Sequence, residues 1–128
     1  MAAVDQRGLP PGYPYRPDDE TTPRELAALL AAKADVVVLD VRTQPEWEIC
    51  RIAGARLLPL QELERRIDEL KADLDDDLSR RIVVNCHHGR RSLTAAYMLR
   101  AAGFTGVTSL AGGIDLWSRD IDPSVPTY

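Results

Sequence analysis

The chain contains an apolar run that leads directly into a cysteine. The stretch is Ile82-Val83-Val84-Asn85-Cys86-His87-His88-Gly89-Arg90-Arg91-Ser92. The first four residues predict a buried strand, because continuous β-branched runs are typical of parallel strands covered on both faces. Ser92 is a preferred N-cap residue, and the apolar residues that follow it have helical spacing. We therefore expect a helix that is capped by Ser92 and ends at Gly103. Cys86 then lies in a strand-to-helix loop.

The loop after Cys86 has the features of an anion-binding site. Backbone N–H groups in such a loop converge on one point, and the N-terminus of the following helix adds partial positive charge there. Two histidines and two arginines stand in the same loop. The sequence therefore predicts that Cys86 carries its thiolate, the nucleophilic form, at neutral pH. We expect Cys86 to be the nucleophile, and His87, His88, Gly89, Arg90, Arg91 and Ser92 to form the anion-binding loop.

Strands and helices alternate on both sides of this loop. Strands are predicted at residues 36–39, 56–58, 82–85 and 107–110. Helices are predicted to begin after the Thr22 capping box and to span residues 45–49, 60–71, 92–103 and 114–117. This alternation predicts an α/β fold, with a central parallel sheet and helices on both faces. Ligands of such sheets bind beyond the carboxyl ends of the strands, where Asp40, Arg42 and Cys86 are expected.

The length of 128 residues and the hydrophobic content of 45% predict one compact domain, over residues 22–122. Residues 1–21 hold four prolines and two glycines. They are predicted to form an irregular arm that is either mobile or laid over the domain surface. Residues 123–128 are predicted to form an extended tail, because they contain two prolines.

The composition argues against several classes of partner. The net charge is −4 and no basic face stands out, so no nucleic-acid partner is expected. No apolar run approaches the length of a bilayer span, and no signal-like segment is present, so we expect a cytoplasmic protein with no membrane partner. Two cysteines are too few for a disulfide scaffold. One loop cysteine beside two adjacent histidines lacks the spaced ligand pairs of a zinc site, and no metal or other cofactor is expected.

Several motifs, taken in order, resemble the rhodanese domain over about residues 22–122. They are Asp40-Val41-Arg42, Ile52-Ala53-Gly54-Ala55, the loop from Cys86 to Ser92, Ala102-Gly103-Phe104, and Leu110-Ala111-Gly112-Gly113-Ile114 up to Trp117. The resemblance implies a single rhodanese-like domain with sulfurtransferase activity. A sulfane sulfur would be taken from thiosulfate or a persulfide donor, held as a persulfide on Cys86, and passed to a thiophilic acceptor.

Two further segments narrow the resemblance within this family. Residues 49–52 and 121–128 are most similar to the single domains that are fused to, or work beside, the adenylyltransferases that activate sulfur-carrier proteins. A sulfur-carrier protein or its adenylyltransferase is therefore an implied partner. Many members place His-Ile-Pro-Gly-Ala where this chain has Arg51-Ile52-Ala53-Gly54-Ala55. That departure keeps the glycine of the turn and leaves the role of the family's histidine open.

The spacing of the loop separates two kinds of chemistry. Phosphatases of similar architecture use Cys-x5-Arg, a loop that admits a tetrahedral phosphate, whereas four residues separate Cys86 from Arg91. A shorter ring of N–H donors suits a single sulfur atom. A cysteine-dependent phosphatase, an arsenate reductase and a non-catalytic interaction module remain as alternatives. The intact loop cysteine favours an enzyme.

The charged residues near the loop are given separate roles. Arg91 is predicted to pair with Asp40 at the neighbouring strand end, in a charge-assisted clamp. Arg90 is predicted to face solvent, where it could meet the sulfonate of thiosulfate. Cys50 is interpreted as a small buried residue, with a resolving thiol as the alternative. Which of the two histidines faces the site is left open.

Overall fold

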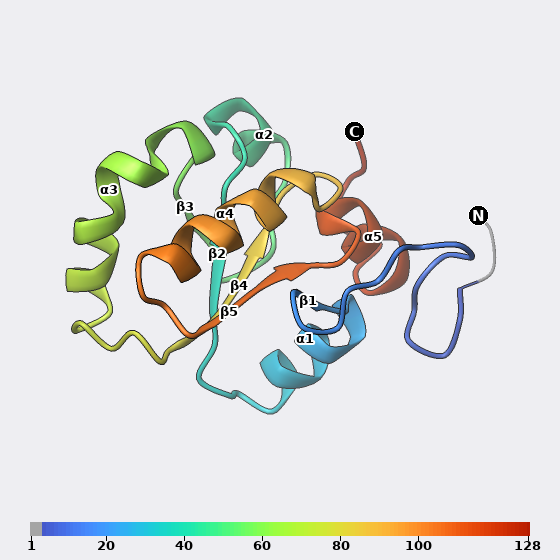
Figure 1. The fold of residues 1–128 in the computed structure, drawn as a ribbon. Coiled ribbons are helices and arrows are strands. Elements are labelled where there is room, and N and C mark those ends of the chain that lie inside the picture. The colour runs from blue at the N-terminus through green and yellow to red at the C-terminus, as the bar shows by residue number, and fades with distance from the viewer. Residues whose placement is uncertain (1–3) are drawn as a thin grey trace.

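The computed structural model describes residues 4–128, which form a five-stranded parallel sheet with helices on both faces (Figure 1). The strand order is β1-β5-β4-β2-β3. The strands are β1 (Glu20–Thr21), β2 (Val37–Asp40), β3 (Arg56–Leu57), β4 (Arg81–Asn85) and β5 (Gly106–Leu110). The helices are α1 (Pro23–Ala31), α2 (Gln44–Ile49), α3 (Leu60–Asp73), α4 (Arg90–Ala101) and α5 (Gly113–Asp120). The α/β fold expected from the sequence is confirmed.

The central strand β4 divides the core into two clusters. Its side chains alternate between the faces of the sheet, as the period of a strand requires. Val84 packs with Leu99 of α4 in one cluster, which α3 also covers. Val83 packs in the other cluster with Leu26 of α1 and Ile114 of α5. The apolar run of β4 is therefore buried on both sides, and the chain that follows it emerges at the carboxyl edge of the sheet.

Thr22 and Thr43 each cap the N-terminus of a helix with a capping box. The hydroxyl of Thr22 accepts a hydrogen bond from the N–H of Glu25, and the Glu25 carboxylate accepts one from the N–H of Thr22, each at 3.1 Å. This confirms the capping box expected at the start of α1. Thr43 and Glu46 form a second capping box at the start of α2, which places Glu46 in the first turn of that helix.

The expected cap of α4 is wrong. The helix begins at Arg90, its N-cap is Gly89, and Ser92 lies inside the first turn. The Ser92 hydroxyl does not cap because it points into the core, where its Oγ lies 2.7 Å from the Oγ of Ser109. Gly103 follows the helix with a φ of 107°, as expected for a helix-ending glycine.

The described part of the N-terminal arm is packed against the domain. Leu9 is only 1% exposed and lies in a small cluster with Ala111 and Leu116. The last two residues of the predicted irregular arm, Glu20 and Thr21, form β1 and pair with β5. The described part of the arm, residues 4–21, therefore lies against the domain.

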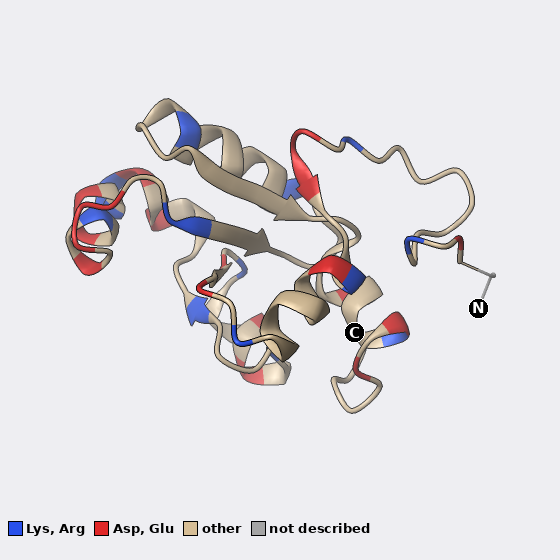
Figure 2. Ribbon diagram, turned by 90° about the horizontal axis from the view of Figure 1, so that it is seen from below, with Lys and Arg blue, Asp and Glu red and all other residues tan. Residues whose placement is uncertain are grey.

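The surface of α3 carries charges of both signs in close alternation, as the helix at the left of Figure 2 shows. Arg66 of this helix forms ion pairs with Glu62 at 3.2 Å and with Glu69 at 3.0 Å. The exposed face of α3 is therefore a mixed, largely self-paired charged surface. Within residues 4–128, no helix is long and apolar enough to cross a membrane.

The packing of Leu9 makes a prediction about the arm. We expect Leu9→Ala to lower the free energy of unfolding by about 2 to 4 kcal/mol, because it deletes a buried side chain and leaves a cavity. Urea unfolding followed by circular dichroism measures this change. The control is Pro11→Ala in the exposed part of the same arm. Equal stability of the two variants would show that the arm does not pack as described.

Candidate active site

The thiol of Cys86 lies at the carboxyl end of β4 and is buried, with only 1% of the residue exposed. Its Sγ accepts a hydrogen bond from the backbone N–H of Gly89 at 3.1 Å. The thiol also lies 3.4 Å from the hydroxyl oxygen of Ser92, to which it donates. The loop therefore curls back so that its own backbone and the first turn of α4 meet the sulfur. Such a geometry stabilises negative charge on the sulfur.

Gly89 makes this curl possible. Its φ of 107° lies in the left-handed region that favours glycine. As the N-cap of α4, it turns the chain from the loop into the helix. A side chain at this position would strain the backbone at the same place where the N–H meets the sulfur.

Ser109 of β5 supports the loop from the neighbouring strand. It is fully buried, and its hydroxyl lies 2.7 Å from that of Ser92 and donates to the carbonyl of Gly89 at 3.4 Å. Sequence reasoning did not identify Ser109. The sequence feature that could have identified it is a residue with a hydroxyl group inside a strand that was expected to be buried.

Helix α5 holds the backbone of the loop from the other side. The N–H of Ile114 donates to the carbonyl of Cys86 at 2.8 Å, and the N–H of Asp115 donates to the carbonyl of His87 at 3.0 Å. This approach requires glycine at position 113, because a Cβ there would lie within 2.6 Å of both carbonyl oxygens. The Gly112-Gly113 pair is therefore a docking point between α5 and the cysteine loop.

The expected pairing of Arg91 with Asp40 is wrong. Asp40 instead pairs with Arg42, whose Nε and Nη2 donate to the two carboxylate oxygens at 3.0 and 2.7 Å. Both side chains are fully buried. Because Arg42 occupies both oxygens of Asp40, Arg91 has a different partner. It donates to the two oxygens of Glu46 at 2.6 and 2.9 Å.

Glu46 was not among the residues that the sequence analysis identified. Its signal was available, because Thr43 and Glu46 have the spacing of a capping box. In the structure, the hydrogen bonds from Arg91 hold the pKa of Glu46 well below its usual range, although burial opposes that shift. The carboxylate is therefore charged throughout the neutral range and anchors Arg91 at the start of α4.

Tyr128 also reaches the site, from the predicted tail. Its hydroxyl donates to Oε2 of Glu46 at 2.7 Å and accepts a hydrogen bond from Nη1 of Arg42 at 3.0 Å. Its ring stacks on the ring of His87, with centroids 3.9 Å apart and an interplanar angle of 6°. Burial raises the pKa of Tyr128 to about 12, so the hydroxyl keeps its proton at neutral pH. The sequence analysis used Tyr128 only as part of the resemblance of residues 121–128 and gave it no role at the site.

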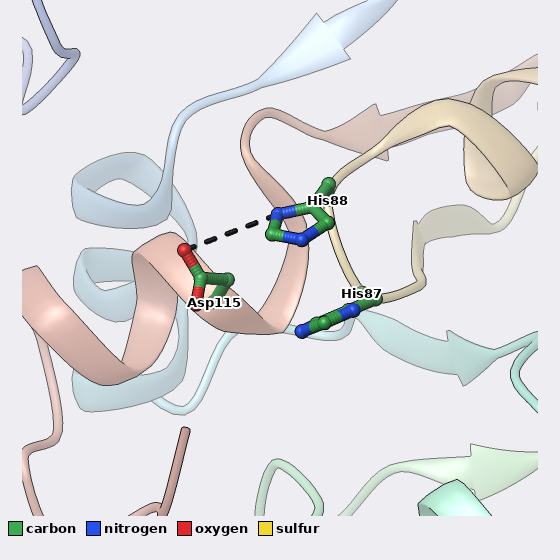
Figure 3. A group of neighbouring side chains, drawn as sticks. All are labelled: His87, His88 and Asp115. Carbon is green, nitrogen blue, oxygen red and sulfur yellow. Dashed lines mark ion pairs between the residues drawn. The ribbon is translucent and has the colours of Figure 1, made fainter. Parts of the chain in front are cut away.

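The two histidines of the loop differ in their surroundings. His87 is half-buried, and burial together with the neighbouring charge of His88 lowers its pKa. His88 is exposed, and its Nδ1 lies 3.9 Å from Oδ2 of Asp115 in α5, as Figure 3 shows. The structure therefore places His87 on the inner side of the loop and His88 toward solvent.

His87, His88 and Asp115 bring one ligand atom each to within 4.8 Å of one another. Among the described residues, they are the group that could hold a metal ion. Oδ2 of Asp115 already accepts a hydrogen bond from Nε of Arg119 at 3.1 Å, so a metal would compete with an existing ion pair. The expectation of no metal remains a prediction.

Arg90 and Cys50 lie as expected from the sequence. Arg90 is exposed on the first turn of α4. Cys50 is buried in the cluster on the opposite side of the sheet from the one that contains Cys86. Both cysteines are free thiols, and the carbonyl of Cys50 accepts a hydrogen bond from Arg42 at 2.6 Å. These surroundings favour a structural role for Cys50 over a role as resolving thiol.

Comparison with known protein families decides the identity of this fold. The profile of the rhodanese-like domain matches residues 22–120. The chain belongs to the rhodanese-like domain family. The resemblance that its motifs suggested is therefore confirmed, and the cysteine loop described above is the loop of a rhodanese-like domain.

Individual relatives agree with this assignment. The chain is 36% identical over 93 residues to "Adenylyltransferase and sulfurtransferase MOCS3-1" of Zea mays, a match that covers 72% of this chain and 20% of that protein. The chain thus spans about a fifth of the length of this curated relative. The human single-domain sulfurtransferase TSTD1 superposes with a TM-score of 0.69 and 29% identity, covering 78% of this chain and 95% of that one. A Rhodopseudomonas palustris protein described as a possible tyrosine phosphatase superposes with a TM-score of 0.71 and 28% identity, covering 86% and 84%.

The ion pair of Glu46 and Arg91 predicts a pH dependence of stability. At pH 7 we expect Glu46→Gln to lower the free energy of unfolding by about 1 to 2 kcal/mol, because the pair is only partly exposed to solvent. The pKa of Glu46 is lower in the folded state than the ordinary value of 4.5. The contribution of the carboxylate is therefore fully present above pH 4.5 and is lost progressively as the pH falls from 4.5 toward the folded-state value.

Urea unfolding of the wild type and of Glu46→Gln at pH 7 and pH 3 measures this dependence. The stability difference should shrink at pH 3. Glu48→Gln, an exposed change in the same helix, is the control and should have little effect at either pH. A difference between the wild type and Glu46→Gln that stays constant over this range would contradict the assigned charge state of Glu46.

Proposed function

We propose that this rhodanese-like domain is a sulfurtransferase that carries sulfane sulfur as a persulfide on Cys86. The observation that carries the proposal is the position of the Cys86 sulfur, which meets the N–H of Gly89 at 3.1 Å beside the N-terminus of α4. A persulfide is anionic, and donors directed at its position stabilise it without reorganisation during the reaction. A single sulfur atom needs no larger ring of donors.

The proposed reaction has two displacements at sulfur. The Cys86 thiolate attacks the outer sulfur of thiosulfate, the S–S bond of the donor breaks, and sulfite leaves with the bonding electron pair. A thiophilic acceptor then attacks the outer sulfur of the Cys86 persulfide, and Cys86 leaves again as a thiolate. A persulfide donor would react in the same way, with a thiolate as the leaving group. No net oxidation occurs, because the sulfane sulfur moves between nucleophiles.

The surrounding residues fit separate parts of this reaction. The N–H of Gly89 stabilises the charge on the sulfur, and the Glu46–Arg91 pair holds the start of α4. Arg90 is exposed at the same helix end and could attract the sulfonate group of thiosulfate. The buried pair of Asp40 and Arg42 supports the site from the end of β2.

The relatives support a narrower proposal about partners. The maize relative is named for adenylyltransferase and sulfurtransferase activities, and the human structure is a single-domain sulfurtransferase. We therefore include a sulfur-carrier protein or its adenylyltransferase as a partner that would receive the sulfur. The soluble pool of thiosulfate is the simplest donor for a first test.

The geometry disfavours the phosphatase alternative, although a possible tyrosine phosphatase is among the structural neighbours. A phosphate needs an arginine free to contact its equatorial oxygens. Arg91 commits both of its Nη atoms to Glu46. The loop of this chain also has four residues between Cys86 and Arg91, which leaves a narrower ring than Cys-x5-Arg.

The persulfide is directly testable by mass. After incubation with thiosulfate, the intact wild-type protein should gain one sulfur, and Cys86→Ser should gain none, because a hydroxyl does not accept sulfur under these conditions. Cys50→Ser is the matched control and should still gain one sulfur. Intact-mass spectrometry gives the result, and circular dichroism verifies that the variants fold. An added sulfur on Cys86→Ser would contradict the assignment of the carrier.

The alternative chemistry has its own test. We expect the wild-type protein to show no hydrolysis of an aryl phosphate between pH 5 and pH 9, with an authentic tyrosine phosphatase as the positive control. We expect this because the loop from Cys86 to Arg91 is too short to surround a phosphate, and because Arg91 is already hydrogen-bonded to Glu46. Hydrolysis that disappears in Cys86→Ser would replace the sulfurtransferase proposal with a phosphatase.

A further inference from the structure

Tyr128 joins several parts of the site that the sequence does not connect. We propose that Tyr128 is a positioning residue of the cysteine loop, which holds His87 through its ring and links the two ion pairs beside the loop through its hydroxyl. Its effect on turnover rests on the proposed sulfurtransferase function, whereas its effect on the shape of the loop does not.

The hydroxyl of Tyr128 lies between two charged pairs. It donates to Glu46, which holds Arg91 at the start of α4, and it accepts from Arg42. Arg42 is in turn held by Asp40 at the end of β2. One phenol thus connects the carboxyl end of β2, helix α2 and the first turn of α4. A side chain with no hydroxyl would remove this link and leave the longer hydrogen bond from Nη1 of Arg42 to the backbone carbonyl of Glu46, at 3.3 Å.

The ring of Tyr128 covers His87, the residue that follows Cys86. The two rings lie 3.9 Å apart and nearly parallel, so they stack over much of their faces. The ring of His87 also contacts the ring of His88, with centroids 3.9 Å apart and an interplanar angle of 34°. His87 therefore contacts two rings, and its backbone carbonyl accepts a hydrogen bond from the N–H of Asp115. Displacement of the Tyr128 ring would release the side chain of His87 and expose it to water.

The segment that carries Tyr128 is itself anchored. Val125 is only 8% exposed and packs in the core cluster of α1 and α5. The hydroxyl of Ser118 in α5 donates to the carbonyl of Val125, and the N–H of Val125 donates to the carbonyl of Asp122 at 3.0 Å. These contacts bring the chain back over the domain. Tyr128 therefore reaches the site from a supported backbone.

Two substitutions separate the functions of the ring and the hydroxyl. Tyr128→Phe removes the hydrogen bonds and keeps the stacking, whereas Tyr128→Ala removes both. Tyr97→Phe is the matched control, because it also removes a tyrosine hydroxyl from a carboxylate, in this case Asp19 at 2.9 Å on the outer side of α4. Cyanide-dependent turnover of thiosulfate reports on function. NMR of the Gly89 amide and of the His87 imidazole reports on the loop without any reaction.

The expected results form a graded series. Tyr128→Phe should lower kcat about fivefold, because it removes both hydrogen bonds of the hydroxyl. It should leave the KM for thiosulfate nearly unchanged, because the hydroxyl is committed to Glu46 and Arg42. The titration of His87 should not move in this variant. Tyr128→Ala should lower kcat by more than about tenfold. Its His87 pKa should rise toward 6.5, because burial is the main cause of the lowered value.

Four charged or titratable groups lie around His87 and can affect its pKa. They are His88 from the same loop, Asp115 from α5, Glu46 from α2 and Tyr128 itself. Each of them except Tyr128 is unchanged in the variants, so a shift of the His87 titration in Tyr128→Ala alone reports on the loss of the ring. The Gly89 amide signal should shift in both Tyr128 variants and stay in place in Tyr97→Phe.

A double-mutant cycle tests whether the hydroxyl acts through Glu46. The effects of Tyr128→Phe and Glu46→Gln on kcat should be less than additive, because both interrupt the same connection to Arg91. Glutamine keeps the geometry of the capping box, so α2 should still form. Fully additive effects would show that the hydroxyl acts independently of Glu46 and would overturn this part of the proposal.

The two proposals fail in different ways. If the wild type takes up sulfur but both Tyr128 variants match Tyr97→Phe in turnover, in the Gly89 signal and in the His87 titration, Tyr128 is not a positioning residue. If the wild type takes up no sulfur but the two NMR signals shift as expected, the positioning by Tyr128 stands and the sulfurtransferase function fails.

Discussion

A buried guanidinium organises this site. Arg42 is fully buried, and an unpaired charge in such a place would cost several kcal/mol. The guanidinium therefore donates hydrogen bonds to several acceptors. They are both carboxylate oxygens of Asp40, the backbone carbonyls of Glu46 and Cys50, and the hydroxyl of Tyr128. These acceptors come from the end of β2, from both ends of α2 and from the C-terminal segment. The hydrogen bonds of this one side chain thus join β2 and α2 to Tyr128, which lies 86 residues from Arg42 in the sequence.

The cysteine loop is shaped by backbone groups more than by side chains. Gly89 takes a left-handed conformation so that its N–H meets the Cys86 sulfur, and Gly113 allows α5 to approach the carbonyls of the loop. The side chains around it then hold this backbone: Ser109 from β5, and Glu46 through Arg91. A loop that is fixed in this way holds the N–H of Gly89 at the Cys86 sulfur without rearrangement, which is the form of preorganisation used in electrostatic stabilisation.

The same contacts support the proposal of sulfur chemistry over phosphorus chemistry. In a loop that binds phosphate, the arginine must be available to the ligand. Here the guanidinium of Arg91 is held by the Glu46 carboxylate, whose pKa is lowered and which also accepts hydrogen bonds from Thr43 and Tyr128. The arginine therefore serves the architecture of the loop, and the exposed Arg90 is the cation of the first helical turn that remains accessible to an anionic donor.

Local patterns in the sequence determined most of the fold and the position of Cys86, the proposed nucleophile. The β-branched run before Cys86, the capping box at Thr22 and the alternation of elements each depend on residues close together in the chain, so a reading of the sequence recovered the parallel sheet and placed Cys86 at its carboxyl edge. The same reading wrongly assigned the cap of α4 to Ser92, because the local preference of a serine could not reveal a buried hydroxyl partner on β5, 17 residues away.

Only the tertiary structure decided the partners of the charged groups. Arg91 pairs with Glu46 across 45 residues, and Tyr128 reaches Glu46 across 82 residues. Such pairs depend on how whole elements pack and on which carboxylates are already occupied, as Asp40 is by Arg42. Spacing along the chain carries no information about that competition. The sequence alone therefore determined where the Cys86 sulfur lies, and the packing of α2 and of the C-terminal segment determined what holds its loop.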